Sequence, residues 1–439
     1  MFKNNKYNLT AFLLWSAYFC HGIQALLISQ NANYFAVKWN LISQADLTDP
    51  AKLTVATGTV LAAVAWTGWG KLSFLAFSGP LSDKIGRKPL IVIGLLGYVL
   101  MFVSFLFATN IILVKFLAFV GGAMTSFFDG AINPALFEMY PDNKSTASVL
   151  GKTFISVSSI LYPLAVAFIG TNGLASEISI WIPLVLSAAV LIGVFFAKFP
   201  DLDLQKEEGL SASEAIKELE KRQNVVATGT IEKANHGNFA LDGTILSVFA
   251  LAIYSNFYLF QQASKIYATN VLHMSENAAA SVTSLYQLGG LVATFVFAIM
   301  MARGVRDMAI LAVSPIFAGL AGILVYFAPS PMTLTIAGII VGFCAAGGLL
   351  QMGNGVLNQF FDTNKGRNTS VYYFVMALGS IIIPKAAGSL IAAGKGELIM
   401  LIVAGTGFVS AALMFFAGTR YSHIFGVSIF SNSKNKVQD

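Results

Sequence analysis

The sequence predicts an all-α membrane protein with twelve transmembrane helices in two six-helix repeats. Of its 439 residues, 56% are hydrophobic and only 11% are charged, whereas soluble globular chains carry roughly 25% charged residues. So few charges cannot cover a surface exposed to water, and we therefore expect most of the outer surface to face lipid. The apolar runs are continuous, and about 20 apolar residues in a helix cross a bilayer core of ~30 Å. Continuous runs predict helices and exclude a membrane β-barrel.

Twelve apolar runs are long enough to cross a bilayer, and one long polar stretch, Pro200–Ala240, separates the sixth run from the seventh. Within this stretch, Ser211 and Glu214 have the spacing of a capping box, which predicts a short surface helix after them. The expected spans cover residues 11–37, 55–79, 89–109, 111–139, 149–172, 178–198, 241–268, 276–302, 308–328, 331–360, 368–393 and 397–418. The expected divisions are a first half at 1–199, a cytoplasmic linker at 200–240, a second half at 241–418 and a cytoplasmic tail at 419–439.

The distribution of Lys and Arg predicts the orientation of the chain. With the N-terminus in the cytoplasm, 20 of the 27 basic residues fall on the cytoplasmic side, counting Lys152 at a helix start. This asymmetry follows the positive-inside rule and predicts that both termini are cytoplasmic. The net charge of +6 does not indicate a nucleic-acid partner, because the basic residues lie in short loops between apolar runs. The first run, Ala11–Val37, is too long for the core of a cleavable signal peptide.

An internal repeat relates the two halves. An offset of 221 residues aligns the fourth run and the loop after it with the tenth, without a gap, and internal repeats are typical of transporters. Polar matches in one register are less expected by chance than apolar ones in this composition, so the pattern indicates a duplication. The matched positions are Gly121 and Gly342, Asn133 and Asn354, Asn143-Lys144 and Asn364-Lys365, and Pro163 and Pro384.

The most specific motif is the segment from Gly79 to Lys88, Gly-Pro-Leu-Ser-Asp-Lys-Ile-Gly-Arg-Lys, between the second and third runs. Gly79 is expected to permit close helix packing, and Asp83 to cap the third helix or to pair with Arg87. Gly86 allows a turn conformation that a side chain with a Cβ resists. Arg87 can hold a carboxylate through two parallel hydrogen bonds. A plain basic turn is the alternative interpretation.

The residues of this loop match the signature loop of the major facilitator superfamily, which the chain resembles. Three further strings, His21–Asn31, Phe127–Pro141 and Gly342–Phe361, resemble bacterial inner-membrane members of that superfamily. The resemblance implies two halves around a central substrate cavity, a bacterial inner-membrane location, and a role for the loop as a latch between the halves. The equivalent turn of the second half, Arg303–Asp307, keeps basic residues and lacks the ordered acidic position.

Three ionisable residues lie at a similar depth in the first half. Asp129 lies ten residues from the cytoplasmic end of its run, or ~15 Å deep, and Lys71 lies eight residues from Gly79, or ~12 Å deep. His21 is about ten residues into the first run. Charges at this depth are costly and usually face a cavity or a partner. The functional interpretation is substrate or proton handling, and the structural alternative is a buried ion pair that holds helices together.

Polar stripes on four runs predict the lining of a cavity, because the resemblance places the first, fourth, seventh and tenth helices around it. The alternative for each stripe is hydrogen bonding between helices. Glu138, at the cytoplasmic end of the fourth run, is expected to be a gate or latch partner for basic loop residues. Lys115 and Lys385 lie towards the outer ends and are expected to snorkel. The stripes are His21, Gln24 and Asn31; Thr125, Asp129 and Asn133; Tyr254, Tyr258 and Gln261; and Gln351, Asn354 and Asn358.

Several classes of function have no motif in the sequence. There is no Walker loop, no His, Cys and carboxylate cluster with the spacing of a metal site, and no nucleophile turn. We therefore expect no enzyme, no cofactor and no metal. The expected partners are a small-molecule substrate, H⁺ and the lipid bilayer, and the expected state is a monomer.

The leading hypothesis is a secondary active transporter that moves a small polar or anionic organic solute by alternating access, with proton symport. Drug/proton efflux is an alternative, but Ser158–Pro163 keeps the proline and lacks the glycines of the drug-antiporter motif in the fifth helix. A non-transporting membrane sensor is a third alternative. It would need a signalling domain, and the tail from Thr419 is too short for one.

Overall fold

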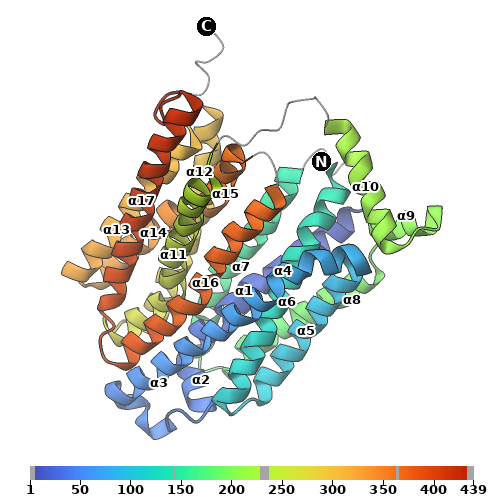
Figure 1. Ribbon diagram of the computed structural model, residues 1–439. Coiled ribbons are helices and arrows are strands. Elements are labelled where there is room, and N and C mark those ends of the chain that lie inside the picture. The colour runs from blue at the N-terminus through green and yellow to red at the C-terminus, as the bar shows by residue number, and fades with distance from the viewer. Residues whose placement is uncertain (1–4, 142–143, 228–236, 362–364, 433–439) are drawn as a thin grey trace.

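The computed structural model describes residues 5–141, 144–227, 237–361 and 365–432 (Figure 1). Within these residues, twelve helical spans are long and apolar enough to cross a membrane, which confirms the predicted fold class. Large apolar side chains such as Phe107, Phe196 and Phe327 are exposed on the outside of the bundle. Such a surface suits lipid and not water.

The first six spans are formed by eight helices, because the first two spans are each broken. The first break is at Asn31, and the second is at Val64. The helices are α1 (Asn8–Gln30), α2 (Ala32–Lys38), α3 (Pro50–Ala63), α4 (Ala65–Ile85), α5 (Arg87–Phe107), α6 (Ile111–Met139), α7 (Lys144–Thr171) and α8 (Ile178–Phe196), with the 3₁₀ turn η1 (Gln44–Thr48) before α3.

Two short helices, α9 (Pro200–Glu208) and α10 (Ala212–Ala227), follow the sixth span. The six spans after them begin with the π-helical turn η3 (Phe239–Gly243). They comprise α11 (Thr244–Asn270), α12 (Glu276–Ala302), α13 (Asp307–Phe327), α14 (Pro331–Val341) with the π-helical turn η4 (Gly342–Ala346) and α15 (Leu349–Phe360), α16 (Lys365–Ala392) and α17 (Leu398–Phe425).

Local capping explains where the helices differ from the predicted spans. The carboxylate of Asp49 accepts hydrogen bonds from the backbone amides of Ala51 and Lys52, and Pro50 takes the first helical position, so α3 begins five residues before the predicted start at 55. The predicted capping box is present, since Ser211 and Glu214 exchange hydrogen bonds before α10. The tenth span was predicted as one helix, but Gly348 adopts φ +99° and separates α15 from α14.

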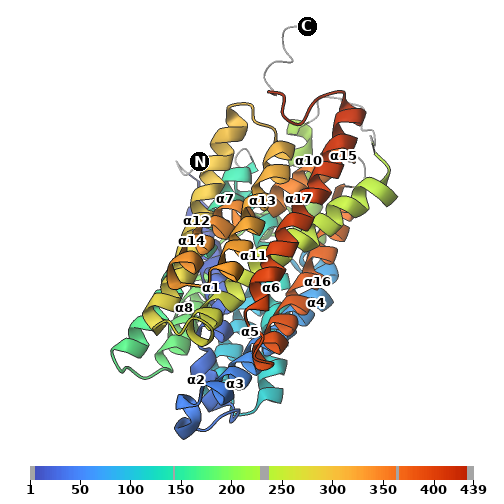
Figure 2. The same cartoon turned by 90° about the vertical axis from the view of Figure 1, so that its left-hand side faces the viewer.

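The helices run lengthwise in two adjacent bundles, with the two ends of the described chain at the same end of the molecule (Figures 1 and 2). We call this end the terminal face and the opposite end the far face. The bundles meet where α3 and α4 pack on α16 and where α7 packs on α12. Of all the spans, those of α1 and α11 have the largest shares of buried residues, so these two helices lie near the middle of the assembly.

Candidate functional site

Two helices that carry residues of the site, α4 and α6, cross at close distance. A methyl group on Gly122 would collide with the backbone of α4 at Thr67 and Lys71, and one on Gly70 would collide with the backbone of α6 at Phe119. The hydroxyl of Ser126 donates to the carbonyl of Lys71 at 2.8 Å. Small residues let the two backbones approach, and the crossing positions the side chain of Lys71 near α6.

Lys71 and Asp129 form an ion pair in the interior of the first bundle. The Nζ of Lys71 lies 2.9 Å from Oδ2 of Asp129, and the two side chains are 25% and 35% exposed. Asp129 is within electrostatic range of Tyr18 and Tyr98 of the first bundle and also of Tyr254 on α11 and Tyr373 on α16 of the second bundle. The pair is therefore partly exposed and is not sealed in the interface between α4 and α6.

His21 lies in a hydrogen-bonded group beside this pair. Its Nδ1 is 3.0 Å from the hydroxyl of Tyr98, which is 3.0 Å from Oγ1 of Thr125. The hydroxyl of Thr125 also donates to the carbonyl of Gly121. His21 is within electrostatic range of both Lys71 and Asp129. The structure therefore brings together the three ionisable residues that the sequence placed at one depth.

On the second bundle, Tyr254 and Tyr258 stack with ring centroids 4.9 Å apart. Gln261 follows them on α11 and is partly exposed. Its neighbour Gln262, which the sequence analysis did not select, is buried and donates to the carbonyl of Ala25 at 3.0 Å. This bond joins α11 to α1 of the first bundle.

The polar residues of α15 divide into two groups. Asn354 accepts a hydrogen bond from the hydroxyl of Thr369 at 3.0 Å, and Asn358 donates to the same hydroxyl at 3.3 Å, so both contact α16. Gln351 is exposed and does not share the contact with Thr369. Its amide is 3.1 Å from Nζ of Lys152 on α7, in the amide orientation that also lets its nitrogen donate to the carbonyl of Gly348.

Three other selected residues lie on or at the end of α1 and on α6, the helices that carry His21 and Asp129. Gln24 is buried on α1, against the position where Gly121 of α6 lacks a side chain. Asn31 is buried at the far end of α1 and donates to the hydroxyl of Tyr162 at 2.9 Å. Asn133 lies one turn beyond Asp129 on α6 and is partly exposed. The roles of these residues in binding stay predictions.

The loop motif forms an ion cluster at the terminal face. Arg87 is 3% exposed, and its guanidinium contacts the carboxylates of Glu138 and Asp83. Gly86 has φ +99°, the left-handed turn expected of it. The backbone amide of Arg87 donates to Asp201 of α9, and Lys88 donates to the carbonyl at the end of α8, Ala197. All these contacts lie within the first bundle and the segment that follows it.

One detail of the motif differs from expectation, and one of the two alternatives for Asp83 is observed. Gly79 was expected to permit close packing, but among the described residues nothing lies within 4 Å of where its Cβ would be. Of the two alternatives for Asp83, pairing with Arg87 is the one observed, since its carboxylate contacts that guanidinium, while α4 continues through Asp83 to Ile85.

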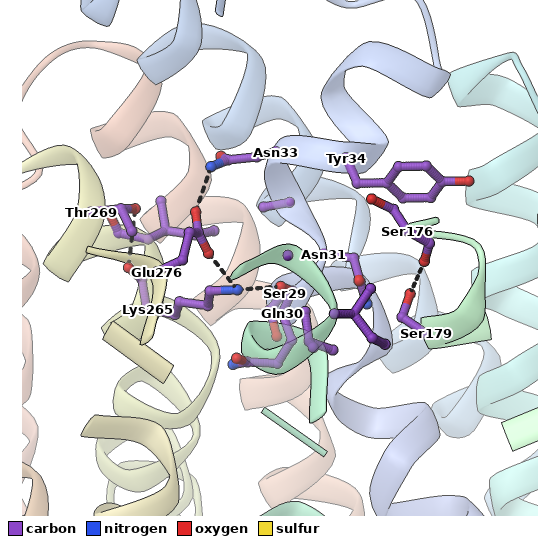
Figure 3. A pocket seen from close by; sticks show the side chains of 15 residues that line it. Ser29, Gln30, Asn31, Asn33, Tyr34, Ser176, Ser179, Lys265, Thr269 and Glu276 are labelled. Atoms are coloured by element: carbon purple, nitrogen blue, oxygen red, sulfur yellow. Dashed lines mark hydrogen bonds and ion pairs between the residues drawn. The ribbon is translucent and has the colours of Figure 1, made fainter. Parts of the chain in front are cut away.

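At the far face, Lys265 joins the two bundles. Its Nζ donates to the carbonyl of Gln30 on α1 at 2.7 Å and is 2.9 Å from the carboxylate of Glu276. Asn33 of α2 donates to the same carboxylate at 2.8 Å. Figure 3 shows this group beside a pocket of about 180 Å³ between the ends of α1, α7 and α11. The group holds the far face together.

Two further hydrogen bonds join the bundles toward the far face. Asn270 donates to the hydroxyl of Thr57 at 2.8 Å, and Ser284 donates to the carbonyl of Ile160 at 2.9 Å. The carbonyl of Gly388 on α16 would lie 2.6 Å from a methyl group on Gly58 of α3, so these helices touch backbone to backbone. The far face is thus closed by packing as well as by polar contacts.

Comparison with known proteins agrees with this arrangement. The sequence model of the Major Facilitator Superfamily matches residues 10–263 and 244–425. The chain belongs to this superfamily. It is 27% identical over 393 residues to the inner membrane transport protein YdiN of Escherichia coli K12, a match that covers 90% of this chain and 86% of YdiN. The inner membrane transport protein YdiM of the same organism is 27% identical over 383 residues, which are 87% of this chain and 86% of YdiM.

Among solved structures, a D-xylose-proton symporter aligns with a TM-score of 0.70 and 12% identity, over 93% of this chain and 97% of the symporter. This likeness shows the fold and does not identify a substrate. The membership, the twelve spans and the two relatives together make the chain a membrane transporter, as the sequence predicted.

Proposed function

We propose that this transporter moves a small polar or anionic organic solute across the bacterial inner membrane by alternating access, coupled to proton symport. The observation that carries the proposal is the Lys71–Asp129 ion pair, which is partly exposed and lies within electrostatic range of Tyr254 on the second bundle. Charged side chains inside a membrane are costly and mark substrate or proton pathways. The names of YdiN and YdiM as inner membrane transport proteins support the location.

The proposed orientation places the terminal face in the cytoplasm. The loop that carries Lys84, Arg87 and Lys88 lies there, as do the basic residues of α9 and α10, in keeping with the positive-inside rule. In this orientation the far face is the outer side, and the contacts around Lys265 close it. The described state is then one in which solute exchanges with the cytoplasm.

Coupling follows from the charge balance of the pair. With both residues charged, Lys71 and Asp129 neutralise each other, and the pair tolerates a low-dielectric setting. When a proton neutralises Asp129, Lys71 loses its counter-ion and becomes available to the solute. Asp129 is thus the proposed proton carrier, and His21 with Tyr98 is a polar neighbour that keeps water or solute close to it.

The test is transport by purified protein in liposomes, with a solute found by screening uptake in cells that express the protein. We expect Asp129→Asn to exchange labelled solute across the membrane but to fail to accumulate it under an imposed proton gradient. Asp46→Asn, an exposed acid outside the bundle, is the matched control and retains accumulation.

Two outcomes oppose the coupling role. Folded Asp129→Asn protein that still concentrates solute under a proton gradient contradicts it. The structural interpretation gains instead if Asp129→Asn fails to fold while the double variant Lys71→Met/Asp129→Asn folds and accumulates, because removing one member of a buried pair costs about 3–5 kcal/mol.

A further inference from the structure

Lys152 is a charged residue inside the fifth span, on α7. The apolar pattern of the sequence predicts a helix start near Lys152, but α7 begins at Lys144, so Lys152 lies eight residues, or ~12 Å, along the helix from the terminal face. Its side chain is partly buried. A charged side chain at this depth in a membrane is costly, and it usually faces a cavity or pairs with another group.

Lys152 has no acidic partner in the described part of the chain. Among the residues that the structure describes, no carboxylate lies within ion-pair distance of its Nζ, and its contact is the neutral amide of Gln351 at 3.1 Å. Three other cations that are buried or partly buried do have carboxylate partners: Lys71 with Asp129, Lys265 with Glu276 and Arg420 with Asp242. No described carboxylate pairs with Lys115 either, but Lys115 lies near the far end of α6, within snorkelling reach of that surface.

Lys152 and Gln351 lie on opposite bundles. Gln351 is nine residues from the end of α15, or ~14 Å, and Asp129 is ten residues from the end of α6, or ~15 Å, so all three lie at a similar depth from the terminal face. Because the charges of Lys71 and Asp129 cancel, the positive charge of Lys152 is not balanced by any carboxylate of the described residues around it. An unpaired charge away from bulk water is strongly unfavourable, and a bound anion relieves it.

We propose that Lys152 and Gln351 bind the carboxylate of the transported solute, which is an organic monoanion. The ammonium group of Lys152 contacts one carboxylate oxygen, and the amide nitrogen of Gln351 donates to the other after the amide turns. One carboxylate then contacts both bundles and links occupancy to their relative movement. This assignment rests on the proposed transport function and names its substrate class.

The experiment is thermal unfolding of the purified full-length protein in detergent, at constant sodium concentration. The probes are lactate, gluconate and 4-hydroxybenzoate, each beside its neutral primary amide. We expect at least one carboxylate to raise the unfolding temperature of the wild type while its amide does not. Lys152→Met weakens that binding at least about tenfold, the loss expected for a hydrogen bond to a charged group. Lys152→Arg and the control Lys115→Met stay within about twofold of wild type.

Gln351→Glu keeps the proposal testable if Lys152→Met does not fold. The new carboxylate is opposite Lys152, so it replaces the substrate's anion as the counter-ion. We expect this variant to fold and to lose carboxylate binding at least about tenfold. The proposal is overturned if no carboxylate stabilises the wild type, or if Gln351→Glu binds the carboxylate as the wild type does.

Flux measurements separate this inference from the proposed function. If liposomes with the protein accumulate the neutral amides and not the carboxylates, the transport function stands and the anion site is wrong. If carboxylates bind in a Lys152-dependent way and none is transported, the site stands and the transport function is wrong.

Discussion

A pair of glycines at the crossing of α3 and α16 makes the closed far face sensitive to a single methyl group. A Cβ on Gly58 would lie 2.6 Å from the carbonyl oxygen of Gly388 and 2.7 Å from the backbone nitrogen of Ala392. Both neighbours are backbone atoms, which cannot turn aside as a side chain can. The change Gly58→Ala therefore requires the two helices to separate at this point.

The size of the effect follows from those distances. Inserting a methyl group into a packed interface typically costs 1–3 kcal/mol, and this cost applies only to the state in which α3 touches α16. Alanine also favours helix by about 1 kcal/mol over glycine, but that gain is shared by every state in which α3 is helical. We therefore expect Gly58→Ala to shift the population away from the closed far face by about five- to 150-fold.

Spin-label distances measure this shift. Labels at Lys52, on the exposed start of α3, and at Lys395, in the turn after α16, report on the far face when Cys20 and Cys344 are first replaced. We expect longer distances to gain population in Gly58→Ala. The control is Gly405→Ala, because nothing lies within 4 Å of a Cβ there. Identical distance distributions for the two variants would refute the reasoning.

Three further predictions concern the latch, the far-face ion pair and the orientation. Asp83→Asn should lower the transport rate much more than solute affinity, because Asp83 contacts Arg87 at the terminal face; normal turnover with weakened binding argues against this. Glu276→Gln should loosen the far face in the same direction as Gly58→Ala, because Lys265, 6% exposed, loses its counter-ion; unchanged spin-label distances oppose it. A single cysteine at Ser145 should react with impermeant thiol reagents only from the cytoplasm and one at Asn40 only from outside; labelling of Ser145→Cys in intact cells contradicts the topology.

The fold was predictable because its signals are local. Continuous apolar runs identify spans without any knowledge of packing, and the structure contains all twelve. The helix ends were less accurate where a cap decides them. The Asp49-Pro50 pair that starts α3 was readable in the sequence as a start signal, but the apolar pattern alone placed the start at residue 55.

The site was only partly predictable, because contacts between helices depend on tertiary packing. Shared depth correctly indicated that Lys71 and Asp129 could meet, and they form an ion pair. The positions of Lys152 and Lys265 required the structure, since hydropathy does not show which face of a helix meets the other bundle. One signal was present but unused: the small-residue spacing of Gly58 with Ala62 on α3, and of Gly388 with Ala392 on α16, is typical of close helix crossings.

The most direct test of proton-coupled transport is the pH inside liposomes during solute entry. The liposomes hold a pH-sensitive dye, the membrane voltage is clamped with potassium and valinomycin, and the identified solute is added outside with no pH difference imposed. Symport through Asp129 predicts that the lumen of wild-type liposomes acidifies as solute enters, while Asp129→Asn liposomes exchange labelled solute without acidification. Solute entry at the wild-type rate with no change in internal pH would contradict the coupling mechanism.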